Sequence, residues 1–215
     1  MLKFTGIAFF IKCGLLAALI SFYLNSPQKN IDGVGRQKNN YRVGLLPYKG
    51  FDSSLMSSLK KETEDFYKCE VVLLKTVTLP SFAYYAPRNR YKADSLLVYE
   101  QGMIPANINA VAGLTNKDIS TSKGMIPDWG VFGLGMCPGK ACVISTYRLN
   151  RTSKTITQLK ERLVKVVLHE IGHNLGLPHC SNDPLCLMTD AGGTIKQVDN
   201  EKKWLCRSCR NKLGW

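Results

Sequence analysis

Blocks of apolar and polar positions along the chain predict both strands and helices. Helical spacing of apolar residues predicts helices over 53–67, 94–103 and 155–175. Short apolar runs bounded by turn residues predict strands, which cover 42–46, 70–76, 107–114, 130–136 and 141–149. The last helix opens on a capping pair, Thr155 and Gln158. Strands and helices alternate first and strands dominate later, so we expect an α/β fold in which helices pack on a mixed, mainly parallel, twisted sheet.

The N-terminus carries the longest apolar run. Residues 4–24 include a single charged side chain, Lys12, and the run is long enough to cross a membrane as a helix. A signal peptide with residues 1–12 as its basic part is the competing interpretation, but no small-x-small cleavage site follows. We therefore predict an uncleaved membrane anchor over residues 1–25, with export after signal cleavage as the alternative. Basic residues after the run favour a domain on the cytoplasmic side of the membrane. Exported proteins with such N-termini commonly place the domain on the opposite side, so both orientations remain open.

Composition adds a linker, a domain and a strong positive charge. Residues 26–40 are polar and rich in Gly and Asn, as linkers are, which leaves residues 41–215 for one domain. The chain of 215 residues is 45% hydrophobic, which is ordinary for a globular protein, and its formal net charge is +13. The basic residues are spread along the chain without a nucleic-acid recognition motif. We therefore expect a solvated basic face, near an anionic membrane, rather than a nucleic-acid partner.

All three histidines lie within one short window that reads H-E-x-x-H-x-x-G-x-x-H. His169 and His173 are four residues apart, so a helix places them one turn apart on the same face, within reach of one metal ion. Glu170 is rotated off that pair, where it can hold a water molecule at the metal. Gly176 can end the helix in a left-handed conformation, and His179 can then supply a third ligand from outside it. Three protein ligands leave one position open, which is typical of a catalytic zinc.

Four cysteines follow the histidines, and the last two form C-x-x-C: Cys180, Cys186, Cys206 and Cys209. Residue type and spacing predict a structural zinc site, so we expect two zinc ions per chain. His179 and Cys180 would then bind different metals from adjacent positions, so loss of the structural zinc should displace His179. Two disulfides, or a redox C-x-x-C, are the alternatives.

The other cysteines show no metal-binding pattern. Cys137 and Cys142 flank a Pro-Gly turn, where a hairpin disulfide and two packed thiols are both open interpretations. We expect Cys69 in the core.

The two motifs together resemble the archaemetzincins, a branch of the metzincin zinc peptidases. The family's pattern continues with C-x-M, matched by Cys186 and Met188, then a 17-residue spacer over 189–205 and the closing C-x-x-C. Five residues separate Cys180 and Cys186, where the family's pattern has four. The resemblance covers residues 41–215. It implies a metzincin-like twisted sheet with an active-site helix, a small C-terminal zinc-bound subdomain, and Met188 as the hydrophobic base under the histidines.

Two further segments resemble the family, and one position differs from some of its relatives. Residues 112–118 look like the family's strand-to-loop segment, and residues 144–149 look like its edge strand. Some metzincins place a helper tyrosine two residues after the methionine. Here that position is Asp190, so we assign no such helper.

The predicted function is zinc-dependent hydrolysis of peptide bonds in a peptide or protein substrate. Glu170 would accept the proton of the attacking water and pass it to the leaving amine, while zinc stabilises the oxyanion. An extended substrate could add to the sheet along 141–149, or along 130–136 if that strand is the edge. A non-catalytic zinc-stabilised binding protein is one alternative, against which the intact Glu170 argues. A zinc amidase acting on a non-protein substrate is another, because it would use the same chemistry.

Overall fold

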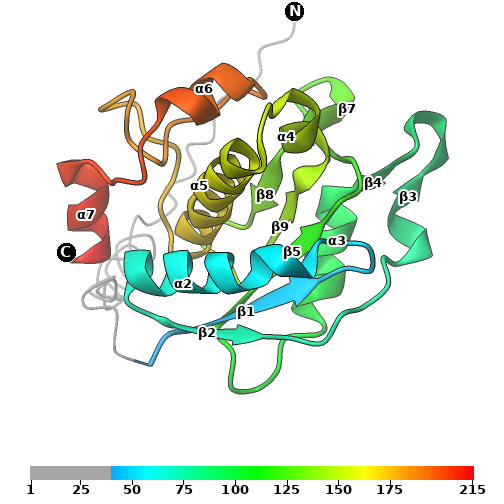
Figure 1. Ribbon diagram of the computed structural model, residues 1–215, viewed down its shortest axis with the longest axis horizontal. Helices are drawn as coiled ribbons and strands as arrows, with labels where there is room; N and C mark the ends of the chain where they lie inside the picture. Colours follow the sequence, from blue (N-terminus) through cyan, green and yellow to red (C-terminus); the bar gives the residue numbers. More distant parts are fainter. Residues whose placement is uncertain (1–39) are drawn as a thin grey trace, which may run out of the picture. The chain divides into compact units, whose positions relative to one another are not determined.

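The computed structural model describes residues 40–215 (Figure 1). The predicted membrane anchor and nearly all of the predicted linker lie outside this range, so the anchor stays a prediction from the sequence. Within residues 40–215, none of the helices combines the length and the apolar character that crossing a bilayer would require.

Five strands form the main sheet, in the spatial order β2–β1–β5–β9–β8 (Figure 1). The first four are parallel to one another, and β8 is antiparallel at one edge. The prediction of a mixed, mainly parallel sheet is therefore confirmed. The strands are β1 (Arg42–Pro47), β2 (Glu70–Leu73), β5 (Ala110–Thr115), β9 (Ala141–Ser145) and β8 (Gly133–Gly135).

A smaller sheet has the order β3–β4–β6–β7. Its strands are β3 (Tyr84–Tyr85), β4 (Arg90–Lys92), β6 (Ile119–Lys123) and β7 (Ile126–Val131). β6 and β7 pair as an antiparallel hairpin, and Gly124 takes a φ of +57° in its turn. A glycine suits this turn because the left-handed region strains other residues. The hairpin stands beside β8 and forms one wall of the site described below.

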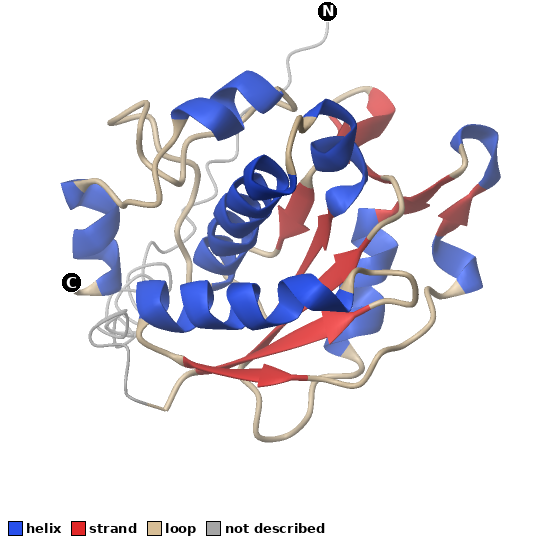
Figure 2. Cartoon of the chain, viewed as in Figure 1, coloured by secondary structure: helices blue, strands red, loops and turns tan. Residues whose placement is uncertain are grey.

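Helices cover both faces of the main sheet (Figure 2). They are α2 (Met56–Tyr67), α3 (Ala93–Gln101), α4 (Thr146–Thr152), α5 (Ile156–Asn174), α6 (Ile195–Asn200) and α7 (Arg207–Leu213), with 3-10 turns at η1 (Ser53–Leu55), η2 (Ser81–Ala83) and η3 (Ala86–Arg88). α2 and α5 lie on one face and α3 on the other. Alternation along β9 explains this arrangement, because Cys142 and Ile144 join the core under α5 whereas Ala141 and Val143 join the core under α3.

Several predicted elements end elsewhere in the structure. The strand expected over 141–149 stops at Ser145, whose hydroxyl accepts a hydrogen bond from the Tyr147 N–H at 3.1 Å and so caps α4. The run 130–136 divides between β7 and β8. The run 70–76 is shorter than predicted, and it lies at the sheet edge with Leu73 47% exposed rather than buried.

The C-terminal segment has no core of its own. Cys180, Cys186, Cys209 and Leu213 belong to the same buried cluster as the apolar faces of α2 and α5. The small separate subdomain implied by the family resemblance is therefore better described as a layer packed on the main core. Its helices α6 and α7 were not predicted from the sequence.

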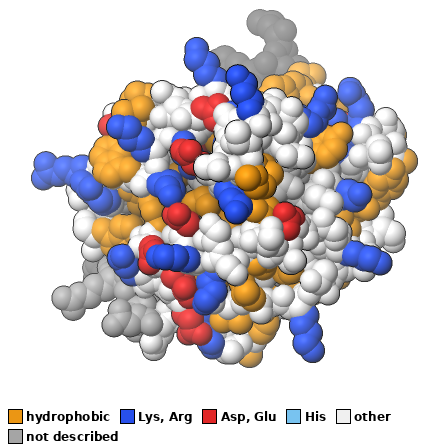
Figure 3. All heavy atoms as spheres, viewed as in Figure 1, with side chains coloured by type: hydrophobic (Ala, Val, Ile, Leu, Met, Phe, Trp, Pro, Cys, Tyr) orange, Lys and Arg blue, Asp and Glu red, His pale blue; other side chains and the backbone are white. Residues whose placement is uncertain are grey.

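Charged side chains are dispersed over one face of the molecule. On the face drawn in Figure 3, Lys and Arg lie scattered among Asp and Glu without a continuous basic band. This agrees with the even spread of basic residues along the sequence.

Candidate metal centres and active-site pocket

Helix α5 carries the histidine motif and is anchored at both ends. At its start, the Thr155 hydroxyl accepts a hydrogen bond from the Gln158 N–H at 3.1 Å, as the predicted capping pair requires. The Gln158 side chain accepts from the N–H of Lys154, one residue before the cap. At its end, the Asn174 amide donates to the carbonyl oxygens of Met136 (3.0 Å) and Ala141 (2.8 Å). The last turn of α5 is thus tied to β8 and β9.

The three histidines come together at the end of α5. Their ring centres lie 4.7 Å (His169–His173), 4.8 Å (His173–His179) and 5.4 Å (His169–His179) apart. One nitrogen from each ring lies within 4.8 Å of the others. Burial lowers the pKa of His169 to about 3, with the neighbouring His173 adding to the shift, so this ring is neutral at physiological pH. Neutral imidazole is the form that binds a metal ion.

Backbone carbonyls set the orientation of two of these rings. His169 Nδ1 lies 2.7 Å from the Leu187 oxygen, and His173 Nδ1 lies 2.7 Å from the Leu177 oxygen. Such contacts are typical of metal-binding histidines, because they fix the tautomer and point the other nitrogen at the ion. The donor set therefore fits a zinc ion.

Gly176 reverses the chain between the second and third histidines. Its φ of +89° lies in the left-handed region, as predicted for a glycine that ends the helix. The chain beyond it brings back His179, which is exposed to solvent whereas His169 and His173 are buried.

Glu170 is buried beside the imidazoles and faces β8. A Cβ atom on Gly133 would lie 2.7 Å from the Glu170 side chain, and one on Gly135 would lie 2.8 Å from the Glu170 carbonyl oxygen. Glycine at both positions lets the edge strand approach the carboxylate closely. Burial raises the pKa of Glu170 to about 8, with the nearby carboxylates of Glu201 and Asp190 adding to the shift.

Met188 lies under the histidine-bearing turn of α5. It is fully buried, and a Cβ atom on Gly172 would stand 2.6 Å from its sulfur. Gly172 lies between His169 and His173 along the helix. Met188 is therefore packed against the backbone between the two histidines, where the family resemblance expects it.

The four C-terminal cysteines gather in a second cluster. Cys180 Sγ lies 3.6 Å from Cys206 Sγ, and Cys186 Sγ lies 3.8 Å from Cys209 Sγ. Four thiolates around one zinc at Zn–S of about 2.3 Å would stand about 3.8 Å from one another. All four sulfurs lie within 4.8 Å, and none of the cysteines in residues 40–215 forms a disulfide. This geometry fits a four-cysteine zinc site better than two disulfides.

The two clusters share one loop. The Leu187 carbonyl that orients His169 belongs to the residue between Cys186 and Met188. The Cys180 N–H also donates to the Met188 oxygen at 2.7 Å. The cysteine cluster is thus linked to the histidine cluster through His179–Cys180 and, separately, through the loop that holds His169.

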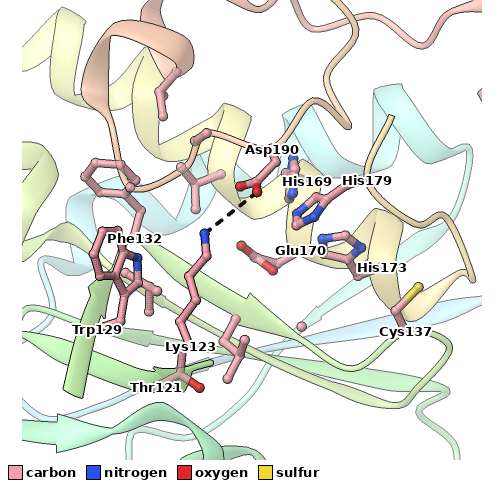
Figure 4. A pocket seen from close by; sticks show the side chains of 18 of the residues that line it. Thr121, Lys123, Trp129, Phe132, Cys137, His169, Glu170, His173, His179 and Asp190 are labelled. Carbon is pink, nitrogen blue, oxygen red and sulfur yellow. Dashed lines mark ion pairs between the residues drawn. The ribbon is translucent and has the colours of Figure 1, made fainter. Parts of the chain in front are cut away.

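A cavity of about 570 Å³ opens beside the histidines (Figure 4). The β6–β7 hairpin, β8, α5 and the segment around residues 190–201 form its walls. At its rim, Lys123 Nζ lies 3.9 Å from Asp190 Oδ2 and 5.4 Å from the centre of the Trp129 ring. A Cβ atom on Gly193 would meet that ring at 3.2 Å. The hairpin therefore reaches across to the loop after Met188.

Sequence reasoning missed most of this wall. Gly124 between two short runs of strand-forming residues is a hairpin signal that could have located Lys123 and Trp129. Nothing in the local sequence predicted Glu201 in the pocket. It follows directly after α6 and reaches the cavity only because α6 packs on α5.

The remaining cysteines of residues 40–215 are thiols. Cys142 is fully buried in the main sheet and Cys69 is buried in the core, as expected for Cys69. Cys137 is exposed in the turn between β8 and β9, and its sulfur contacts the Leu177 oxygen at 3.4 Å. Cys137 and Cys142 are therefore unpaired thiols, and the hairpin disulfide does not form in the structure.

Comparison with known proteins places this arrangement in a family. A family profile described as Peptidase family M54 matches residues 43–214, which include both clusters. The chain belongs to Peptidase family M54. Among M54 relatives, the archaemetzincin of Halobacterium salinarum is 30% identical over 181 residues, which cover 80% of this chain and 99% of the relative.

Solved archaemetzincin structures share the fold. The crystal structure of archaemetzincin from Methanopyrus kandleri superposes with a TM-score of 0.70 at 30% identity, covering 83% of this chain and 96% of that one. The archaemetzincin of Archaeoglobus fulgidus, solved in complex with malonate, gives 0.67 at 32% identity, covering 80% and 99%. The chain is accordingly a zinc metallopeptidase of the archaemetzincin type, and the resemblance stated from the two motifs is confirmed.

Proposed function

We propose that this chain hydrolyses peptide bonds at the histidine cluster, with Glu170 as the general base. The observation that supports this most strongly is the position of Glu170, a buried carboxylate beside three converging imidazoles in the wall of an open cavity. His169, His173 and His179 would hold one zinc ion, which supplies Lewis-acid polarisation of the scissile carbonyl when bound. Cys180, Cys186, Cys206 and Cys209 would hold a second, structural ion.

The other roles in the proposed reaction belong to side chains and backbone groups of the site. Glu170 accepts the proton of the attacking water and returns it to the leaving amine, the two halves of general acid–base catalysis by one positioned side chain. The carbonyls of Leu187 and Leu177 hold the rings of His169 and His173 in place, and Met188 supports the turn of α5 between them. These roles need little movement, because α5 is tied at both ends.

The edge strand β8 offers the place for an extended substrate. It is the antiparallel end of the main sheet, and its residues Gly133–Gly135 line the cavity beside Glu170. A peptide added at this edge would pass Glu170 and the histidines with its backbone already aligned. Strand β9, the first candidate from the sequence, lies between β5 and β8 and has no exposed edge.

Replacing Glu170 by Gln tests the proposal. The amide keeps the size of the side chain but cannot accept the proton, so we expect peptide hydrolysis to fall by at least about 100-fold. Bound zinc, counted by mass spectrometry, should stay at two ions per chain. The control is Glu62→Gln on α2, which removes a carboxylate that pairs with Lys203 away from the cavity.

Retained turnover in the Glu170→Gln protein would exclude Glu170 as the base. If the wild-type protein with both sites loaded cleaved nothing in a broad peptide library, the alternative of a zinc-stabilised binding protein would take precedence.

A further inference from the structure

One buried carboxylate in the cavity wall has no role in the proposed mechanism and no partner in the described residues. Glu201 lines the cavity and is only 3% exposed, and its Oε2 atom has no hydrogen-bond partner within residues 40–215. A buried carboxylate without a partner lowers the stability of the fold, because it has lost its hydration and forms no hydrogen bond or ion pair that compensates. Such a group in a cavity wall indicates a ligand that supplies the missing partner.

The cation whose charge acts on Glu201 is Lys165, and its ammonium contacts other groups. Lys165 on α5 is buried, and its ammonium lies 3.0 Å from the Val198 oxygen, 3.3 Å from the Asp199 oxygen and 3.4 Å from Glu161 Oε1. An ammonium group has three N–H donors, and these three contacts use them all. Lys165 therefore lowers the pKa of Glu201 from a distance without pairing with it, and burial still raises that pKa to about 8.

Glu201 is also held rigidly. It follows directly after α6, whose last turn is fixed by a two-pronged contact between Arg162 and Asp199, at 2.6 and 2.7 Å. With Lys165 on the preceding carbonyls, two side chains of α5 fix the backbone that presents Glu201. A site whose charged group is already in position loses little entropy when a ligand binds.

The surroundings of Glu201 suit a particular ligand shape. Val166, Val198 and Phe132 line the same cavity, so the approach to the carboxylate is largely apolar. Besides Glu201, the ionisable side chains that line the cavity are Glu170, Asp190, Lys123, Cys137 and the three histidines, and Lys123 lies beside Asp190 at the rim. Three carboxylates therefore line the cavity against a single Lys or Arg side chain, although the whole chain carries +13. A flexible hydrocarbon stem that ends in a cation matches both features.

We propose that Glu201 selects substrates with a Lys or Arg side chain next to the scissile bond. The stem of that side chain lies along the apolar wall, and its cationic end pairs with the Glu201 carboxylate. This inference rests on the proposed peptidase function, and it makes Glu201 a specificity-determining residue.

Cleavage-site mapping tests the preference. A mixed peptide library digested by the zinc-loaded protein and analysed by mass spectrometry should show Lys and Arg enriched at one position flanking the cut. From one cleaved sequence, a matched pair is made in which Arg is replaced by citrulline, its neutral isostere. The Arg peptide should have a kcat/KM at least about tenfold higher, because a desolvated charge pair contributes that much or more.

The Glu201→Gln variant should bring the Arg-to-citrulline ratio close to one, whereas Glu62→Gln should leave it unchanged. Equal loss on both peptides would instead mean that Glu201 acts on Glu170, and would overturn the proposal. Peptides with acetylated N-termini separate a side chain from a terminal ammonium as the source of the cation. If acetylation abolished the preference, the side-chain assignment would be wrong.

Binding separates this inference from the proposed function. In the Glu170→Gln background, calorimetry should show tighter binding of the Arg peptide than of the citrulline peptide, and the added Glu201→Gln change should remove the difference. Equal binding of the two peptides would refute the role of Glu201 even if hydrolysis were established. Tighter binding of the Arg peptide without hydrolysis by the wild-type protein would leave Glu201 in its role and refute the peptidase.

Discussion

Glu100 shows how one buried acid can limit the stability of the fold. Its side chain is fully buried under the main sheet, where Oε1 accepts a hydrogen bond from the Tyr48 hydroxyl at 3.0 Å. Burial raises its pKa well above the usual 4.5. The folded protein therefore keeps the proton in a pH range in which the unfolded chain has released it. The contribution of Glu100 to the free energy of unfolding is fully present below about pH 4.5, and it declines as the pH rises toward the folded-state pKa of this group.

The Glu100→Gln variant should remove this dependence, because an amide does not ionise and can still accept from Tyr48. Between about pH 5 and the folded-state pKa, the free energy of unfolding of the wild type should fall relative to the variant by about 1.4 kcal/mol per pH unit. Urea denaturation of both proteins at several pH values measures this. Metal release at low pH affects both alike, so the difference isolates Glu100. Parallel curves would contradict the argument.

At the scale of elements, α5 and the loop carrying Met188 are fitted to each other at one glycine. A Cβ atom on Gly172 would stand 2.6 Å from the Met188 sulfur and 2.9 Å from the Tyr67 hydroxyl. Helix and loop cannot both keep their places if that atom is added, since the interior is close-packed.

The Gly172→Ala variant should accordingly be destabilised by about 1–3 kcal/mol and should bind zinc more weakly at the histidine cluster. Thermal unfolding and zinc competition measure the two effects. Gly102→Ala is the matched control, because its nearest atom would be a carbonyl at 3.5 Å, an ordinary contact, and its φ is −68°. A Gly172→Ala protein as stable as the control would show that the loop yields to the added atom.

The elements divide into those that the sequence predicted and those that it did not. The spacing of His169 and His173 is local, so the period of one helix is enough to predict that they converge. The end of β9 depends on a competition, because the Ser145 hydroxyl caps α4 in a run that otherwise favours a strand. The pocket wall depends on contacts between distant segments. No periodicity in the sequence brings Lys123 to Asp190, or Glu201 to the cavity, so these could only be seen in the fold.

At the scale of the molecule, the cysteine cluster acts as a support for the histidine cluster. Cys180 adjoins His179, and Cys186 adjoins the residue whose carbonyl orients His169. Loss of the structural ion proposed for the cysteines should therefore disturb two of the three imidazoles at once.

Cys209→Ser should lower the zinc content from two ions to one, and should weaken zinc binding at the histidines by about 10–100-fold, as loss of ligand support does elsewhere. Metal analysis and titration with a competing chelator give both quantities. Cys69→Ser, which changes a buried thiol outside both clusters, is the control. A Cys209→Ser protein with one ion bound at wild-type affinity would show that the two sites are independent.

The two glycines of β8 restrict how this enzyme could be redesigned. Any side chain at Gly133 or Gly135 would collide with Glu170, so the strand proposed to align the substrate cannot be diversified without disturbing the proposed catalytic base. The β6–β7 hairpin and the end of α6 carry no such restriction, because they reach the cavity from other elements. A directed-evolution library for new cleavage preferences should therefore vary Trp129 and Glu201, and keep β8 constant.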